Sequence, residues 1–209
     1  MTKLDFKKQL KHLYLPSARE FVVVDVPPMQ FLMVDGHGDP NTAQEYKDAI
    51  EALYAVAYRV KFASKKELDR DYVVPPLEGL WWAEDMQTFT TDRDKTAWDW
   101  IMMILQPDWI TGEMFSGAVK HVERAKSLPA LPKLRLETYQ EGMSVQILHV
   151  GSYDDEGPTL DRMHHEFMPQ NGLEPAGKHH EIYLSDPRKV APEKRKTVLR
   201  QPVREVKGG

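Results

Sequence analysis

The chain has 209 residues, a formal net charge of −4 and no cysteine. This length suits one large domain, or two small modules with a shared core, and needs no disulfide or metal for folding. The lack of cysteine excludes thiol catalysis, cysteine-ligated zinc and disulfide bonds, and it favours a cytoplasmic location.

Residues 1–28 are expected to form an N-terminal extension of the main domain. The first fifteen residues are lysine-rich and amphipathic without a long apolar run, so we expect neither a secretory signal nor a membrane span. Residues 21–26 are β-branched and apolar, which predicts a strand that ends at Pro27.

The next part of the chain predicts a strand, a helix and two further strands. Asp39 is placed to cap the helix and Pro40 to occupy its first turn, and apolar residues at helical spacing end near Phe62. A polar loop over residues 88–94 is expected to join the last two strands as a hairpin. The predicted elements cover residues 29–34, 39–62, 75–83 and 96–105.

The second half predicts a similar series of elements. Thr111 can cap a helix that ends before Pro129. A helical stripe of apolar residues later stops at Asn171 and Gly172. The elements expected here cover residues 112–126, 134–139, 144–150, 160–168, 177–187 and 197–206.

An internal repeat indicates the architecture. The order strand, glycine-containing turn, Asp-capped helix, connector and two strands occurs at residues 29–105 and again at 144–206. We therefore expect an α+β fold of two pseudo-symmetric βαββ modules, with antiparallel sheets around a central ligand groove and helices outside. The expected domain spans residues 29–209, with modules at about 29–128 and 134–209.

The strand at residues 177–187 carries the first candidate site residue. Because side chains alternate along a strand, His179, Glu181 and Tyr183 should share one face, and His180 and Ile182 should lie on the opposite, core face. A glutamate in mid-strand is costly to bury unless a partner or a ligand uses it. Alternatively, the strand lies at an edge and Glu181 faces water or pairs with a basic side chain.

Aromatic residues supply the candidate walls of a cavity. Trp81 and Trp82 must point to opposite faces of a strand, so at most one can line the cavity directly. Trp109 follows a Pro-Asp break and is a candidate for the rim, whereas burial favours Trp98 and Trp100 as core residues.

Metal and cofactor sites are not predicted. The histidine pairs His164-His165 and His179-His180 do not form the His-x-x-x-His spacing of a helical metal site, and neighbours on a strand point to opposite faces. The glycines of residues 36–38 lack the spacing of a dinucleotide or phosphate loop. Acidic and basic residues are interspersed, so no direct binding of nucleic acid is expected either.

Four segments in this order resemble the GyrI-like small-molecule-binding family. They are Asp35-Gly36-His37-Gly38-Asp39-Pro40, Pro76-Leu77-Glu78-Gly79-Leu80-Trp81-Trp82, Leu105-Gln106-Pro107-Asp108 and His180-Glu181-Ile182-Tyr183-Leu184-Ser185-Asp186. The resemblance implies that Glu181 lies at the floor of an aromatic-walled groove for lipophilic, often cationic, xenobiotics. Since residues 1–28 leave no room for a helix-turn-helix, we expect a stand-alone member rather than a transcription regulator.

One branch of this family hydrolyses cyclopropane-bearing DNA alkylators, and the aromatic residues are consistent with that branch. The resemblance then implies a catalytic role for Glu181 and ligand contacts from six residues, which are Trp81, Trp82, Trp109, Tyr153, His179 and Tyr183. Two alternatives stay open, a non-catalytic protein that sequesters a drug or metabolite, and a gyrase-inhibitor-type partner of another protein. The sequence indicates a small-molecule ligand but no particular protein partner.

Overall fold

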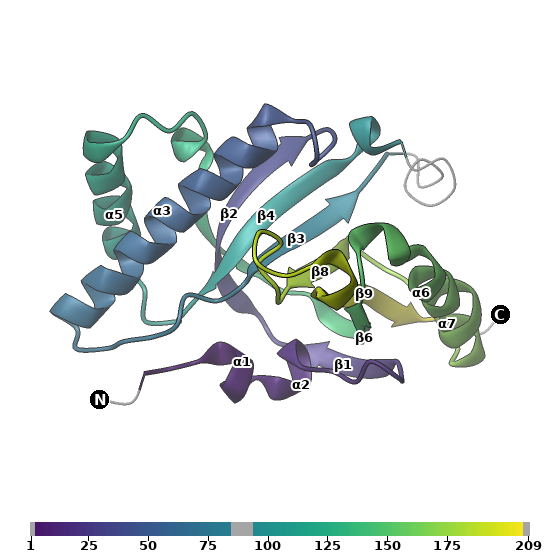
Figure 1. The fold of residues 1–209 in the computed structure, drawn as a ribbon. Coiled ribbons are helices and arrows are strands. Elements are labelled where there is room, and N and C mark those ends of the chain that lie inside the picture. Colours follow the sequence, from purple (N-terminus) through teal and green to yellow (C-terminus); the bar gives the residue numbers. More distant parts are fainter. Residues whose placement is uncertain (1–2, 85–93, 207–209) are drawn as a thin grey trace. The chain divides into compact units, whose positions relative to one another are not determined.

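The computed structural model describes residues 3–84 and 94–206, so the predicted loop over 88–94 lies outside the described residues except for Asp94. It confirms the α+β class, with antiparallel strands and a few helices (Figure 1). The chain divides into two compact units. The first consists of Met1–Gln9 and Met29–Tyr139, and the second of Leu10–Pro28 and Gln140–Gly209.

The first unit is an antiparallel sheet in the order β3, β4, β2, β5. The long helix α3 packs against β2 and β4, and α5 packs against α3 (Figure 1). The main elements are β2 (Met29–His37), α3 (Gln44–Glu67), β3 (Leu77–Trp82), β4 (Asp99–Gln106), α5 (Gly112–Ala125) and β5 (Arg135–Tyr139), with the short α1 (Phe6–Gln9), η1 (Lys95–Ala97) and η2 (Leu131–Lys133).

The start and end of α3 differ from the sequence prediction. The Asp39 carboxylate accepts a hydrogen bond from the Asn41 backbone N–H at 2.9 Å, which stabilises a separate turn before the helix. At the other end the helix continues past Phe62 to Glu67. Lys61 in this part of the helix forms an ion pair with Asp71 at 3.1 Å. The predicted cap of α5 is confirmed.

The second unit is an antiparallel sheet in the order β1, β6, β9, β8, with β7 also paired to β9. Residues of β6 and β9 form a core with the segment that contains α6, the π-helical turn η4 and α7. The elements are α2 (Lys11–Tyr14), β1 (Val22–Val26), β6 (Gly142–Val150), η3 (Tyr153–Asp155), α6 (Gly157–Arg162), η4 (Met163–Phe167), α7 (Met168–Gln170), β7 (Leu173–Pro175), β8 (His179–Tyr183), η5 (Pro192–Lys194) and β9 (Lys196–Glu205).

The predicted repeat is present in the strand orders of the two units. In the first, β2 is followed by a helix and the strands β3 and β4, which give the order β3-β4-β2. In the second, β6 is followed by helical turns and then β8 and β9, which give the order β8-β9-β6. A further strand pairs with the first strand of each, β5 with β2 and β1 with β6. The domain limits 1–28 and 29–209 stay a prediction.

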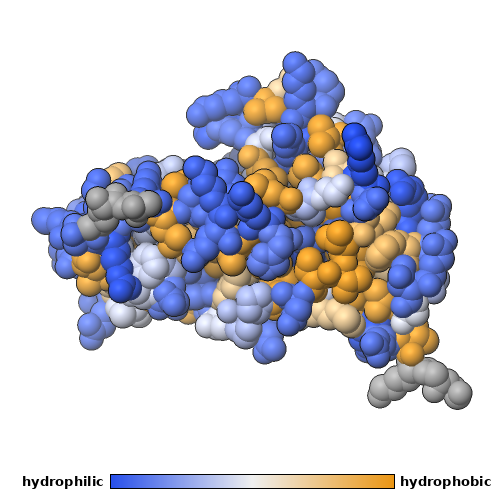
Figure 2. Space-filling view, turned by 90° about the horizontal axis from the view of Figure 1, so that it is seen from below, coloured by the Kyte–Doolittle hydropathy of each residue, from blue (hydrophilic) through white to orange (hydrophobic). Residues whose placement is uncertain are grey.

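In the parts of the chain that the structure describes, no helix is both long and apolar enough to cross a bilayer. Figure 2 shows hydrophilic side chains over the face it displays, with apolar groups exposed between them.

Gly36 tests the packing of the first sheet. Gly36 of β2 lies opposite Trp100 of β4, and an added Cβ would collide with the indole ring. That ring is fully buried and packs edge-to-face on Tyr46 at 5.3 Å, so it has little freedom to move. We expect Gly36→Ala to lower the free energy of unfolding by about 1–3 kcal/mol in urea titrations.

Gly117 of α5 is the matched control for this substitution. Apart from the neighbouring backbone of α5 itself, no atom lies within 4 Å of a Cβ added there, so Gly117→Ala should raise the free energy of unfolding by about 0.5–1 kcal/mol. Equal stability of Gly36→Ala and the wild type would contradict the tight packing of Trp100.

Candidate functional site

Glu181 lies in the middle of β8 with two of its predicted neighbours. The Tyr183 hydroxyl donates a hydrogen bond to Glu181 Oε2 at 2.7 Å, and His179 Nε2 lies 3.6 Å from Glu181 Oε1. These contacts show that the three side chains share one face of the strand, as the alternation predicted. The Glu181 side chain is 15% exposed, so its carboxylate is largely shielded from water.

Tyr153 extends this group from another element. It begins η3, and its ring packs edge-to-face on Tyr183 with the centroids 5.7 Å apart. The Arg195 guanidinium lies 5.4 Å from the Tyr153 ring. Burial raises the pKa of Tyr153, Arg195 lowers it, and the negative charge of Glu181 raises it further, so the phenol stays protonated at neutral pH. The structure thus brings a carboxylate and two aromatic rings together.

Trp81, which was predicted to contact the ligand, lies in the first unit within an aromatic cluster. Its ring centroid is 6.1 Å from Tyr46 and 5.9 Å from Trp98, and the residue is 4% exposed. Trp82, the next residue of β3, is partly exposed. A ligand contact from either residue stays a prediction.

Trp109 takes part in the packing at the end of α3. Its indole N–H donates to Ser64 Oγ at 3.0 Å, and its ring packs edge-to-face on Tyr72 at 6.3 Å. The Arg70 guanidinium lies 5.0 Å from the ring. These contacts give Trp109 a structural role. Its place at the rim of a ligand site stays a prediction.

Sequence patterns did not predict the backbone geometry at His164, a partly buried residue of the second unit. It lies in the π-helical turn η4, a rare geometry that is frequent at functional sites. Burial is the main cause that lowers the pKa of His164 to about 4, with smaller contributions from His179 and His165, so the ring is neutral at pH 7. The apolar stripe of residues 160–168 predicts a helix but gives no sign of the π turn.

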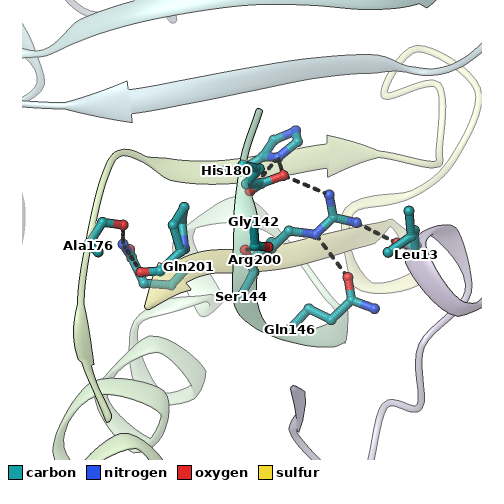
Figure 3. A network of polar contacts seen from close by, with 10 residues as sticks. Leu13, Gly142, Ser144, Gln146, Ala176, His180, Arg200 and Gln201 are labelled. Atoms are coloured by element: carbon teal, nitrogen blue, oxygen red, sulfur yellow. Dashed lines mark hydrogen bonds and ion pairs between the residues drawn. The ribbon is translucent and has the colours of Figure 1, made fainter. Parts of the chain in front are cut away.

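The opposite face of β8 departs from the prediction of an apolar core. His180 and Ile182 are fully buried as expected, but His180 Nδ1 lies 3.0 Å from Glu141. Arg200 of β9 also donates to this carboxylate, at 3.1 Å (Figure 3). A polar network therefore occupies part of this face, because its charged members satisfy one another.

Metal ligation finds no support in the described residues. Within 3–84 and 94–206, no three histidine, aspartate or glutamate side chains are grouped so that they could hold an ion. The arrangement around Glu181 can instead offer a base, a hydrogen-bonded phenol and aromatic faces to an organic ligand.

Comparisons with known proteins identify a family and similar solved structures. A family model described as "GyrI-like small molecule binding domain" matches residues 19–204. The crystal structure of an uncharacterized conserved protein from Listeria innocua is 44% identical, with a TM-score of 0.89 over 97% of this chain and 100% of that one. The crystal structure of a hydrolase from Listeria innocua is 42% identical, with a TM-score of 0.84 over the same shares.

A more distant similarity concerns the fold alone. The C-terminal domain of EcmrR is 11% identical, with a TM-score of 0.57 over 90% of this chain and 98% of that domain. A comparison with curated proteins found no match.

Proposed function

The chain belongs to the GyrI-like family of small-molecule-binding domains, and on that premise we propose that it binds bulky lipophilic or cationic aromatic xenobiotics beside Glu181. The observation that carries the proposal is the largely buried Glu181 carboxylate with the hydroxyl of Tyr183 bound to it at 2.7 Å. The ring of Tyr183 meets that of Tyr153 at this point, so a flat cation would find both a negative charge and aromatic faces.

We further propose that the bound compounds include cyclopropane-bearing DNA alkylators, which the protein hydrolyses in the cytoplasm to protect the cell. The 42% identity to a protein described as a hydrolase supports a hydrolytic reaction. The pairing of a carboxylate with a phenol supports general base catalysis.

The proposed step is the addition of water across one bond of the strained ring. Glu181 Oε1 accepts a proton from water, and the water oxygen forms a bond to a ring carbon. A C–C bond of the cyclopropane breaks, and its electron pair moves to the conjugated electron acceptor of the alkylator. The proton held by Glu181 then passes to that acceptor. Because Tyr183 donates to Oε2, it leaves Oε1 as the basic atom.

Binding can be tested with ethidium, a flat fluorescent cation. We expect Glu181→Gln to weaken ethidium binding about 10- to 100-fold, because loss of an interaction with a charged group costs about 1.5–3 kcal/mol. Phenanthridine, the uncharged parent ring system, should bind both proteins equally. Fluorescence titration measures the affinity for ethidium, and competition with ethidium measures the affinity for phenanthridine.

The control for this titration is Glu205→Gln, which removes an exposed carboxylate at the end of β9. It should leave both affinities unchanged. If Glu181→Gln bound ethidium as tightly as the wild type, a ligand at Glu181 would be excluded. No effect of Glu181→Gln is the result expected of a gyrase-inhibitor-type protein, which would work only through an exposed surface.

A further inference from the structure

A row of polar side chains crosses the sheet of the second unit on the face opposite Glu181. The strand register places His180 of β8 opposite Arg200 of β9, and Arg200 opposite Gln146 of β6. None of the three is more than 1% exposed. A buried guanidinium is tolerated only when its charge is paired and its donors are satisfied, so this row is an ordered part of the sheet.

Arg200 is the centre of this row. Its Nη1 donates to Glu141 at 3.1 Å, its Nε to Gln146 Oε1 at 2.9 Å and its Nη2 to the Leu13 carbonyl at 2.7 Å (Figure 3). Glu141 in turn lies 3.0 Å from His180 Nδ1. Because a guanidinium is a rigid planar fork, these bonds can form together in only one arrangement of the strands.

The same network holds the short helix α2. Gln146 Nε2 donates to the His12 carbonyl at 2.6 Å, next to the Leu13 carbonyl that Arg200 uses. The last carbonyls of a helix have no partner within the helix, so these two side chains satisfy them. The side chains of Leu13 and Tyr14 are fully buried. The family model begins at residue 19, so α2 lies outside the matched residues.

We propose that Arg200, Glu141 and His180 are positioning residues that fix the register of β8 and couple α2 to it. A slip of one residue would turn every side chain of a strand to the other face. The sequence of β8 is His-His-Glu-Ile-Tyr, so its hydrophobic pattern alone defines the register weakly. The polar network fixes the register that the hydrophobic pattern leaves open. It thereby keeps Glu181 and Tyr183 on the face of β8 at which the ligand is proposed to bind. The inference rests on the proposed function, because it takes the Glu181 face of β8 to be the ligand-binding face.

Arg200→Lys tests the inference because lysine keeps the charge but cannot form the three directed bonds. We expect about a tenfold higher Kd for ethidium and faster hydrogen exchange of the amides of residues 179–183. Both are measured at a temperature at which circular dichroism shows a folded protein. Arg204→Lys, on the same strand but in an exposed pair with Glu174, should change neither quantity.

A double substitution separates positioning from mere stability. Arg200→Met combined with Glu141→Leu replaces the buried pair with apolar side chains, a change that often restores stability. The thermal midpoint should recover relative to Arg200→Lys, while the tenfold loss of affinity and the fast exchange of β8 should remain. Recovery of affinity together with stability would overturn the inference.

Hydrogen exchange also separates this inference from the proposed function. If the wild type failed to bind ethidium, the proposed function would fail, yet exchange at β8 would still report on its register. Unchanged exchange of residues 179–183 in Arg200→Lys would refute the positioning role, whatever the ligand result.

Discussion

Glu181→Gln is expected to lower the turnover of a cyclopropane-bearing alkylator about 10²- to 10⁴-fold, the usual contribution of a general base. The substitution preserves the shape of the side chain and its contact with Tyr183, but an amide cannot accept the proton of the attacking water. The assay supplies the alkylator in large excess and follows the ring-opened product by mass spectrometry. The wild type should release many equivalents of product for each protein molecule.

Tyr183→Phe provides a graded comparison in the same assay. It keeps the ring that packs on Tyr153 but removes the hydrogen bond to Glu181 Oε2. A hydrogen bond is worth about 0.5–1.5 kcal/mol, so turnover should fall by up to about tenfold. If wild-type product never exceeded the protein concentration, hydrolysis of this substrate class would be refuted and sequestration would be the better explanation.

The candidate site was predictable where it depends on local geometry. Alternation along residues 179–183 was enough to place His179, Glu181 and Tyr183 on one face, because a strand has a period of two residues. The internal repeat likewise predicted the βαββ order of both units, since turns and hydrophobic periods are properties of short segments.

Features that depend on distant partners were not predictable. The Leu13 carbonyl that Arg200 binds is 187 positions away in the chain, and the Ser64 hydroxyl that Trp109 binds is 45 positions away. Neither pairing leaves a periodic trace in the sequence. His180 was therefore expected in an apolar core, because the alternation predicts burial but does not reveal Glu141 as a buried partner.

The turn before α3 shows a local competition that propensity rules did not resolve. Asp39 and Pro40 satisfy the requirements of a helix start, yet the Asp39 carboxylate binds the Asn41 N–H within its own turn and α3 begins at Gln44. Aspartate side chains favour both arrangements through the same backbone hydrogen bonds, so the sequence pattern could not distinguish them.

Stability at low pH should depend on Glu141. Burial by itself raises the pKa of Glu141, but the charges and hydrogen bonds of His180 and Arg200 outweigh it and lower the pKa from 4.5 to about 2. A carboxyl whose pKa is lowered on folding stabilises the protein, and this stabilisation is complete at pH values above the pKa of the carboxyl in the unfolded chain. That stabilisation, about 3 kcal/mol by linkage, should be lost as the pH falls from about 4.5 towards 2.

Glu141→Gln should lower the free energy of unfolding at pH 7 by about 3–5 kcal/mol, because it leaves the buried Arg200 guanidinium without a counter-charge. Urea unfolding at a series of pH values from 7 to 3 measures the difference in unfolding free energy from the wild type. This difference should narrow below about pH 4.5, because Glu141 then takes up a proton in the unfolded wild type but stays ionised in the folded protein. Glu174→Gln removes an exposed partner of Arg204 and should cost no more than about 1 kcal/mol. A difference that stayed constant down to pH 3 would show that the charge of Glu141 does not stabilise the fold.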